Sequence, residues 1–283
     1  MFALTPGKAV PVGSGIWRLL ALNPGMMSGP GTNTYLIAAG DGLWVLDPGP
    51  EDSRHVDNLA AASAEIGRPV TAVLCTHTHR DHSPCTALVK ERFPVRVLGP
   101  APLDDALQDH SWQPDEVLVD GQVLDLGGAA LKVIATPGHV SNHLCFLHQQ
   151  EGLLFSGDHL INGSTVVIAP PAGSMRAYLD SLRKLQGETL RAIAPGHGDL
   201  IADPAQAIAG TIAHRLQRED KVLDALSRTS VCTPADLVAQ VYQDVPAFLH
   251  PVAEFSLHAH LIKLVEDGRA ESPEDGCYRL KHG

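Results

Sequence analysis

The residues that could do chemistry are concentrated in one short stretch, residues 76–83, which reads THTHRDHS. Four of its side chains can bind a transition metal, namely those of His77, His79, Asp81 and His82. In an extended or looped backbone, side chains two residues apart point the same way, so His77 and His79 can bind one ion. In a helix the same two side chains would diverge by roughly 200°. The alternative interpretation is a histidine-rich surface loop that holds no metal.

Three further candidate ligands each follow an apolar stretch that reads as a strand. They are His139 in TPGH, Asp158 in SGD and His197 in PGHG. A glycine beside each of them lets the backbone turn sharply at the site. With the first stretch they make five histidines and two aspartates. This set is too large for one tetrahedral ion and suits two ions that share a bridging carboxylate.

The elements around the first stretch would place it at the end of a strand. Residues 70–75, which precede it, form an apolar and β-branched run typical of a buried strand. Ser83 and Pro84, which end it, match the N-cap and the first position of a helix. Open α/β sheets often place their sites at such strand-to-helix loops. A glycine-rich loop over residues 23–31 lacks the following helix of a nucleotide-binding fingerprint, so we expect a loop near the site or a simple turn.

The chain divides near residue 203. Strands and helices alternate in two similar halves before this point, which predicts an α/β catalytic domain over residues 1–203. Three helices and two short strands then predict a winged-helix-like domain over residues 204–283. Residues 205–283 carry 8 Lys and Arg against 11 Asp and Glu, a net charge of −3, and the helix predicted at 233–241 has no Lys or Arg. A nucleic-acid-binding winged helix usually presents a basic recognition helix. We therefore expect a packing module, or one through which a homodimer forms.

Composition limits the class of protein. The chain has 283 residues, of which 44% are hydrophobic, and a net charge of −11. No run approaches the about eighteen apolar residues that span a bilayer, and the N-terminus lacks a signal-peptide pattern. A cytoplasmic location without membrane contact is therefore expected. The acidic charge gives no general attraction to nucleic acid. Five cysteines are scattered, and Cys75 and Cys145 lie in strand-like runs where they are expected to be buried.

At these residues the chain resembles the metallo-β-lactamase-fold hydrolases. The matching residues are the HxHxDH motif at 77–82, then His139, Asp158 and His197 in the family's order, with Asp47 after an early strand. The resemblance covers residues 10–203 and implies a four-layer αββα sandwich with two metal ions at one edge. It also implies the roles of the ligands. His77, His79 and His139 would hold the first ion, and Asp81, His82 and His197 the second. Asp158 would bridge the two ions, and Asp47 would orient ligands.

The whole chain is similar to the lactamase-beta-two-like branch of this family. The supporting pieces are GPGTNTYL at 29–36, DPGP at 47–50, TPGH at 136–139 and the winged-helix-like tail. True β-lactamases differ because they carry a cysteine ligand and no histidine in the place of His82. Hydrolysis of antibiotics is therefore not the expected main activity.

Two close metal ions lower the pKa of a water held between them, which gives a metal-bridging hydroxide near neutral pH. The hydroxide would attack a carbonyl or phosphoryl group, and the metals would stabilise the oxyanion. Asp158 would hold the metal pair together, while Asp81 would orient the nucleophile or handle its proton. His143, four residues after His139, is expected to support the ligands or to contact substrate, with a buried strand histidine as the alternative. The leaving-group acid is either His143 or a metal-bound water. Zinc is the expected metal, with iron or manganese as alternatives.

The expected reaction is hydrolysis, but the bond remains open. One hypothesis is cleavage of single-stranded RNA, since a member of the similar branch has endoribonuclease activity. The second is hydrolysis of a small ester or thioester, as in the glyoxalase II-like relatives. A third is a non-catalytic winged-helix regulator that senses metal, against which a full set of seven ligands argues.

Other polar residues have weaker claims. His159 could line the pocket, and Ser164 and Thr165 could contact substrate. His258 and His260 lie two apart in a predicted helix and should not chelate together. The remaining histidines have no partner in the sequence and are expected on the surface. They are His55, His110, His148, His214, His250 and His282.

Overall fold

The structure, a computed structural model, describes residues 5–281, which form two compact units. The first unit runs to Thr136 and includes Asn142–Thr165 and Glu188–Ala205. The second contains Pro137–Ser141, Val166–Gly187 and the chain from Gln206 onward. His139 therefore belongs to the same compact unit as the C-terminal helices.

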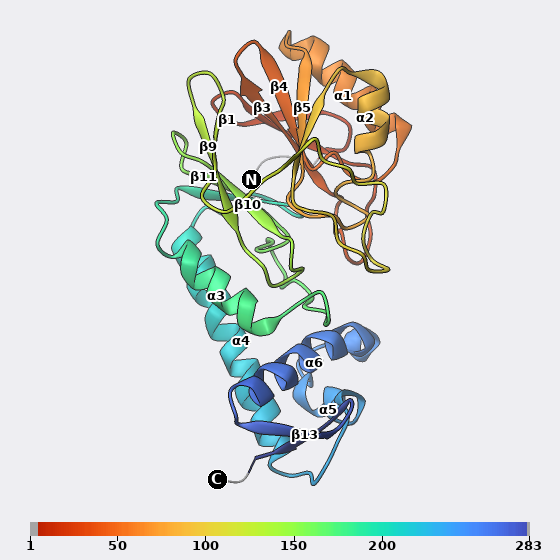
Figure 1. The fold of residues 1–283 in the computed structure, drawn as a ribbon, viewed down its shortest axis with the longest axis vertical. Coiled ribbons are helices and arrows are strands. Elements are labelled where there is room, and N and C mark those ends of the chain that lie inside the picture. Colours follow the sequence, from red (N-terminus) through yellow and green to blue (C-terminus); the bar gives the residue numbers. More distant parts are fainter. Residues whose placement is uncertain (1–4, 282–283) are drawn as a thin grey trace. The chain divides into compact units, whose positions relative to one another are not determined.

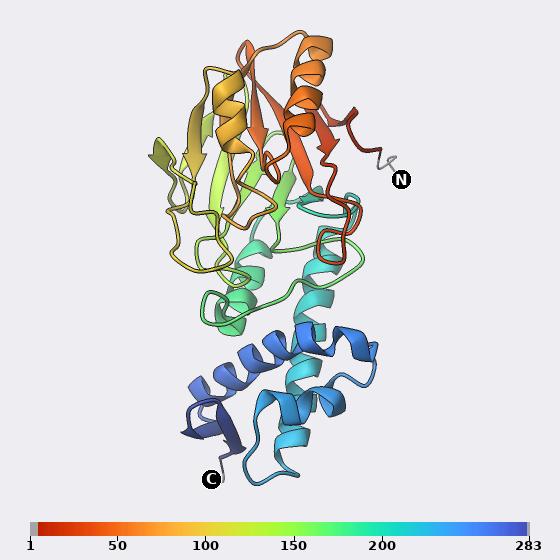
Figure 2. The same cartoon turned by 90° about the vertical axis from the view of Figure 1, so that its right-hand side faces the viewer.

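A seven-stranded sheet forms one layer of the first unit, with its strands in chain order. The strands are β1 (Ala9–Gly13), β2 (Ile16–Leu20), β3 (Asn33–Ala39), β4 (Gly42–Leu46), β5 (Val70–Leu74), β6 (Arg96–Gly99) and β7 (Glu116–Val117). Pairing is antiparallel from β1 to β4 and parallel from β4 to β7. Helices α1 (Ser53–Ile66) and α2 (Thr86–Arg92) cover one face (Figures 1 and 2). Leu59 of α1 and Val89 of α2 pack there against strand residues such as Val45 and Val73.

A five-stranded sheet forms the second layer, in the order β12-β11-β10-β9-β8. Its strands are β8 (Val123–Asp125), β9 (Ala130–Ala135), β10 (Leu144–His148), β11 (Leu153–Gly157) and β12 (Ala192–Pro195). Apolar side chains of both sheets, such as Trp44, Leu74, Phe146 and Phe155, form one buried cluster. Because β11 and β12 are parallel, Asp158 and His197, which follow them, leave the same edge of this sheet.

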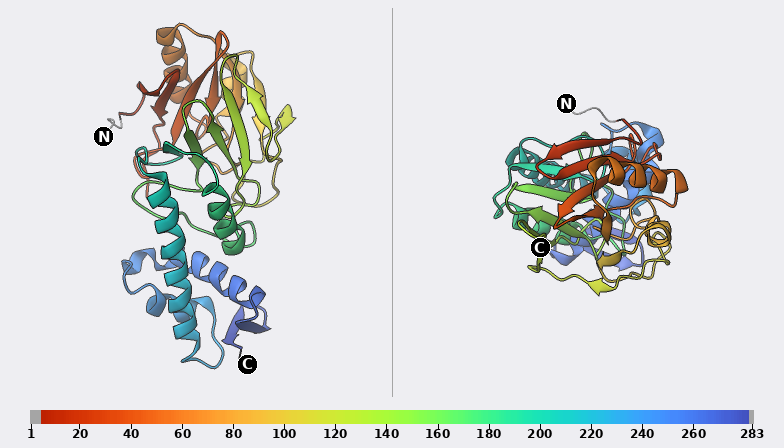
Figure 3. Two further views of the ribbon diagram at one scale, coloured as in Figure 1. Left: turned by 90° about the vertical axis from the view of Figure 1, so that its left-hand side faces the viewer. Right: turned by 90° about the horizontal axis from the view of Figure 1, so that it is seen from above.

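The C-terminal part of the second unit has the predicted winged-helix arrangement (Figure 3). Its elements are α4 (Pro204–Leu226), α5 (Pro234–Val241), the 3₁₀ helix η1 (Ala247–Leu249), α6 (His250–Glu266), and the hairpin of β13 (Ala270–Glu274) and β14 (Cys277–Leu280). Thr233 and Asp236 form a capping box at the start of α5, as the sequence predicts. The same unit holds α3 (Met175–Leu185), which Ser174 caps.

The predicted fold class, an α/β sandwich of two sheets with a C-terminal winged helix, is confirmed. Cys75 and Cys145 are fully buried, as predicted. The predicted start of α2 is wrong, because the helix begins at Thr86 and not at Pro84. The Ser83 hydroxyl donates to Asp109 Oδ2 at 2.7 Å, which ties this residue to the 105–112 segment.

Within residues 5–281, no helix combines the length and the apolar composition that crossing a bilayer requires.

Candidate metal centre

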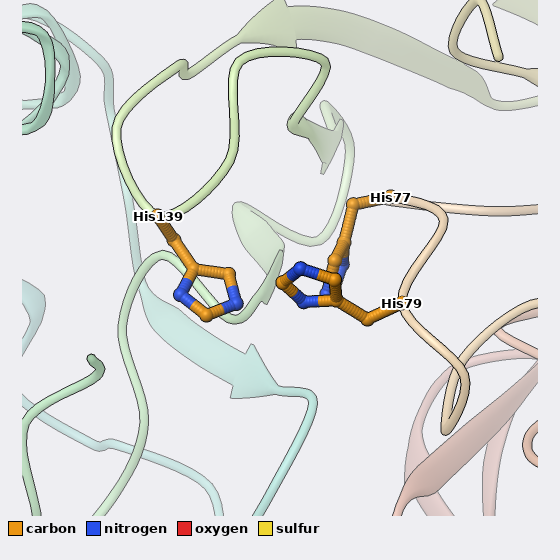
Figure 4. A group of neighbouring side chains, drawn as sticks. All are labelled: His77, His79 and His139. Carbon is orange, nitrogen blue, oxygen red and sulfur yellow. The ribbon is translucent and has the colours of Figure 1, made fainter. Parts of the chain in front are cut away.

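Three groups of side chains place candidate ligand atoms close together. The groups are His77, His79 and His139; His77, His82 and Asp158; and Asp81, His82 and His197. Within each group the ligand atoms all lie within 4.8 Å of one another. Figure 4 shows the three imidazole rings of the first group turned toward one another. The seven residues that the sequence singles out as candidate ligands are those that make up these groups.

Asp47 fixes the rings of two of these histidines. Its Oδ2 accepts from His82 Nδ1 at 3.0 Å and from the Thr76 hydroxyl at 2.8 Å. That hydroxyl uses its proton on Asp47, so it must accept from His77 Nδ1, which lies 2.9 Å away. Both rings therefore carry a proton on Nδ1 and direct Nε2 away from Asp47. Such outer carboxylates hold the tautomer and the orientation of metal-binding histidines.

Main-chain carbonyls perform the same task for two other histidines. His139 Nδ1 lies 2.6 Å from the carbonyl oxygen of Val167, and His197 Nδ1 lies 3.2 Å from that of Gly31. A carbonyl can only accept, so each ring donates from Nδ1 and leaves Nε2 to face the other candidate ligands. Gly31 ends the glycine-rich loop, so this loop lies at the site. Of the two predicted alternatives, a loop near the site and a simple turn, the structure shows the first.

The carboxylates of Asp81 and Asp158 face the Nε2 atoms of His82 and His197. Asp158 Oδ1 lies 3.5 Å from His82 Nε2 and 3.4 Å from His197 Nε2. Asp81 Oδ2 lies 3.2 Å from His197 Nε2 and 3.7 Å from His82 Nε2. Both acidic side chains therefore point to the same pair of imidazole nitrogens.

The charges at this place are strongly coupled. Burial alone would lower the pKa of His82, but the carboxylates of Asp81, Asp158 and Asp47 raise it well above its usual value. Burial is likewise outweighed at His197, where Asp158 and Asp81 raise the pKa to about 10. Burial favours the neutral acid at Asp81, yet His82 and His197 lower its pKa to about 2. The site thus attracts positive charge, which protons supply when no cation is bound.

The donor set fits divalent transition metals. Imidazole nitrogen and carboxylate oxygen are the ligands that zinc, iron and manganese accept. In the part of the chain that the structure describes, His82 Nε2 is buried and has no hydrogen-bond partner. Burying such an atom is costly unless a ligand satisfies it. Only glycine fits at position 196 beside these ligands. A Cβ there would meet Asp158 Oδ1 at 2.7 Å and His82 Cε1 at 2.8 Å.

The model of the Metallo-beta-lactamase superfamily matches residues 28–197, and that of the beta-lactamase associated winged helix domain matches residues 233–279. The chain belongs to the metallo-beta-lactamase superfamily. Metallo-beta-lactamase folds typically bind divalent metals, in keeping with the His and Asp groups found here.

Relatives of known name agree with this assignment. An atrochrysone carboxyl ACP thioesterase of Aspergillus fumigatus is 32% identical over 81% of this chain and 74% of its own length. A beta-lactamase-like protein 2 homolog of Drosophila melanogaster is 31% identical over 90% of this chain and 89% of its own. The solved structure of a metallo-beta-lactamase family protein from Thermus thermophilus has a TM-score of 0.79 at 22% identity, and the match covers 94% of this chain and 99% of that one. This metallo-beta-lactamase superfamily chain is a hydrolase.

His143 lies behind Asp158 in this metallo-beta-lactamase fold. The backbone N–H of Asp158 donates to His143 Nε2 at 3.1 Å, so the proton of the neutral ring is on Nδ1. Nδ1 lies 2.9 Å from the hydroxyl oxygen of Thr136. His143 is buried, and these two bonds suit a residue that positions Asp158.

Sequence reasoning missed His55, which was expected on the surface but is fully buried in α1. The Thr34 hydroxyl donates to the carbonyl oxygen of Asp47 at 2.7 Å and accepts from His55 Nε2 at 2.9 Å. Asp47 has a φ of 51°, a left-handed conformation that is strained for a residue with a side chain. Thr34 and His55 therefore support the backbone of Asp47. The spacing of His55, Leu59 and Ala62, which share the buried face of α1, was a signal for its burial.

The sequence also gave no indication that the irregular segment 105–112 supports the candidate ligands. The backbone N–H of Asp109 donates to the Thr78 carbonyl at 2.7 Å, and its side chain accepts from Ser83. The Thr78 hydroxyl donates to Gln108 Oε1 at 2.5 Å. These bonds hold the His77–His82 loop at both of its ends.

The residues with weaker claims are dispersed. His159 is buried next to Asp158, whereas Ser164 and Thr165 are exposed. His258 bonds to the Tyr278 hydroxyl at 2.8 Å, and His260 is buried beside Glu219. Among the described residues these two histidines share no group of candidate ligands, as predicted.

Proposed function

We propose that the chain is a dinuclear metal-dependent hydrolase. The first ion would be held by His77, His79 and His139, and the second by Asp81, His82 and His197. Asp158 would be shared between the two ions. The observation that carries this proposal is the overlap of the candidate groups, since one group joins His77 and His82 through Asp158.

The two ions, when bound, would lower the pKa of a water and stabilise negative charge on the substrate. The residues of the chain would set the geometry. Asp47 holds the Nε2 atoms of His77 and His82 in position, and His143 holds the backbone of Asp158. Asp81, whose side chain is 33% exposed, can accept the proton of the attacking water. The engagement of both ring nitrogens favours positioning by His143 over donation of a proton to the leaving group.

The substrate class that we propose is an ester or thioester of a small or carrier-bound acyl group. Support comes from relatives named as thioesterases. Hydrolysis would form a C–O bond and break the C–S bond, and the thiolate would leave and take up a proton. Such a reaction needs no basic surface, in keeping with the net charge of −11.

The RNA hypothesis has weaker support. Helix α5 carries no Lys or Arg, and Lys263, the one Lys or Arg of α6, pairs with Glu219 and Asp267, so neither helix offers free basic side chains to phosphate. Cleavage of single-stranded RNA therefore serves as the competing outcome of the test. A metal sensor without turnover is the third.

The deciding experiment is a panel of acyl thioesters and esters assayed beside labelled single-stranded RNA, with Asp158→Ala as control. We expect thioester hydrolysis that Asp158→Ala abolishes. RNA cleavage lost in the same variant would replace the thioester proposal, whereas RNA cleavage that survives is contamination. Bound metal without turnover of any substrate would favour the sensor.

Metal content measured on the purified protein tests the ions. We propose two per chain, with zinc first and iron or manganese as alternatives. Location in the cytoplasm and a homodimer through the C-terminal domain stay predictions. Phe248 and Phe255, which are 73% and 51% exposed in that domain, are the residues to replace in a test of the dimer by light scattering.

A further inference from the structure

The segment Val166–Ile168 connects His139 with the C-terminal helices of the second unit. Its middle residue, Val167, supplies the carbonyl oxygen that accepts from His139 Nδ1 at 2.6 Å. The direction of the imidazole ring thus depends on where this carbonyl lies. A main-chain carbonyl moves only if its backbone moves, so the groups that fix the two flanking residues also fix the ring.

Both flanking residues are bonded to side chains of the C-terminal domain. The Val166 carbonyl accepts from Arg215 Nη2 of α4 at 2.5 Å. The Ile168 N–H donates to Ser256 Oγ of α6 at 3.1 Å. Arg215 and Ser256 are 3% and 5% exposed, so water does not compete for these bonds. The peptide unit that orients His139 is held on each side by a buried polar group.

The burial of Arg215 needs an explanation of its own. Among residues 5–281, no carboxylate lies within ion-pair distance of its guanidinium, and its Nε has no hydrogen-bond partner. Besides bonding to the Val166 carbonyl, the guanidinium lies over the ring of Tyr178 in α3, with its central carbon 5.2 Å from the ring centroid. A buried charge without a counter-ion is costly.

The Tyr178 contact leads back to His139. Gly138 approaches Tyr178 so closely that a Cβ at position 138 would meet the Tyr178 Cα at 2.4 Å. The Gly138 carbonyl accepts from the Ser174 N–H at 2.8 Å, and the Pro137 carbonyl accepts from the Ser181 hydroxyl at 2.8 Å. Helix α3 thus holds the backbone before His139, while the segment Val166–Ile168 holds its ring.

We propose that the C-terminal domain is a positioning device for His139, acting through Arg215 and Ser256 on the segment Val166–Ile168. Its use in catalysis rests on the proposed role of His139 as a ligand of the first ion. The proposal gives the winged-helix-like domain a function that needs no nucleic acid. It predicts that substitutions in α4 and α6 weaken the first ion and leave the second in place.

The test uses the full-length chain with Arg215→Met and Ser256→Ala. Arg218→Met is the matched control, because Arg218 is buried on the same helix but bonds to the Val241 carbonyl and to Asp244. The first measurement is competition with a chelator followed by metal analysis. We expect the first ion to be lost at roughly ten-fold lower chelator concentration in the two test variants, as for other outer partners of metal ligands. Arg218→Met should keep both ions, and Arg215→Lys should recover part of the loss.

The second measurement is NMR of the metal-free chain with ¹⁵N-labelled histidine. The Nδ1 proton of His139 should exchange slowly with water in the parent and in Arg218→Met, and rapidly in Arg215→Met and Ser256→Ala. This result would support the positioning role even if the parent bound no metal. The absence of bound metal in the parent would refute only the dinuclear proposal. Equal proton exchange in all variants, with metal retention no worse than in Arg218→Met, would overturn the positioning role. If Arg215→Met does not fold, Ser256→Ala and Arg215→Lys decide by the same two measurements.

Discussion

The His77–His82 loop and the His139 turn (Pro137–Ser141) hold their imidazole rings by different means. In the loop, the carboxylate of Asp47 accepts from His82 and, through Thr76, orients His77. In the turn, a main-chain carbonyl accepts from His139. A carboxylate raises the basicity of the ring more than a neutral carbonyl does. His82 should therefore be a stronger metal ligand than His139, and the turn should depend more on the surrounding fold.

The two regions also differ in what lies behind the acceptor. Asp47 is supported within the first unit by Thr34 and His55. The Val167 carbonyl is supported within the second unit by Arg215 and Ser256. A change in the C-terminal domain should thus affect the turn alone, and a change at Asp47 should affect both proposed ions.

The largest effect is expected from Asp158→Ala, which removes the carboxylate proposed to serve both ions. Without it, the Nε2 atoms of His82 and His197 lose a negative charge at 3.5 Å and 3.4 Å. We expect hydrolysis to fall on the order of a thousand-fold, which corresponds to about 4 kcal/mol in the barrier. Both ions should be lost in metal analysis. Asp41→Ala, in the exposed turn after β3, is the control and should change neither value; loss of only one ion in Asp158→Ala would refute the sharing.

The next largest effect should come from Gly138→Ala, which changes the His139 turn and leaves the His77–His82 loop unaltered. Gly138 has a φ of 153°, and a Cβ would collide with the backbone of Tyr178. We expect the free energy of unfolding to drop by about 3 kcal/mol from overpacking and backbone strain. Gly163→Ala is a matched control, because its φ of 84° is also positive but no atom lies within 4 Å of the added Cβ. It should cost about 1 kcal/mol. Equal losses in a urea titration would show that the close approach to α3 is not needed.

Asp47→Asn should affect the His77–His82 loop, whose histidines Asp47 orients. Asparagine tolerates the left-handed backbone at this position, so the change removes charge and leaves the fold. An amide has one acceptor oxygen, whereas the two carboxylate oxygens now accept from the Thr76 N–H, the Thr76 hydroxyl and His82. We expect affinity for both ions to fall roughly thirty-fold, about 2 kcal/mol. Chelator competition measures this, with the exposed Asp57→Asn as control. A loss confined to one ion would contradict the double role of Asp47.

The candidate ligands could be found in the sequence because histidine and aspartate are residue types that bind metals, and because they follow apolar stretches that read as strands. An α/β domain and the winged helix were likewise visible in strand order and helical spacing, whereas the sandwich of two sheets followed from the resemblance to the metallo-β-lactamase-fold hydrolases. The acceptors of the turn could not be found in this way. Val167 acts through a carbonyl that every residue has, and Arg215 and Ser256 reach it only in the folded chain. Ser83 shows the same limit, since its bond to Asp109, far away in the sequence, forms only in the folded chain.

The smallest effect concerns pH, and here the two regions should behave alike. His55 lies behind Asp47, and His260 lies beside Glu219 in the C-terminal domain, on the same helix as Ser256. Burial lowers the pKa of each to about 4 from the ordinary value of 6.5. The unfolded chain therefore binds more protons than the folded chain between these values. The stability that each neutral histidine preserves is complete above pH 6.5 and is lost as the pH falls toward 4.

Because of each histidine, we expect the free energy of unfolding to fall by about 1 to 2 kcal/mol between pH 7 and pH 5. The measurement is the free energy of unfolding of metal-free protein by urea, taken as the difference between the parent and His55→Gln or His260→Gln. Taking the difference cancels the shared contribution of His82 and His197, whose raised pKa values act in the opposite direction. Each parent–variant difference should shift in favour of the glutamine variant as the pH falls. A difference that stays constant for His55 but not for His260 would mean that water reaches the support of Asp47, and the two regions would then differ in their response to pH.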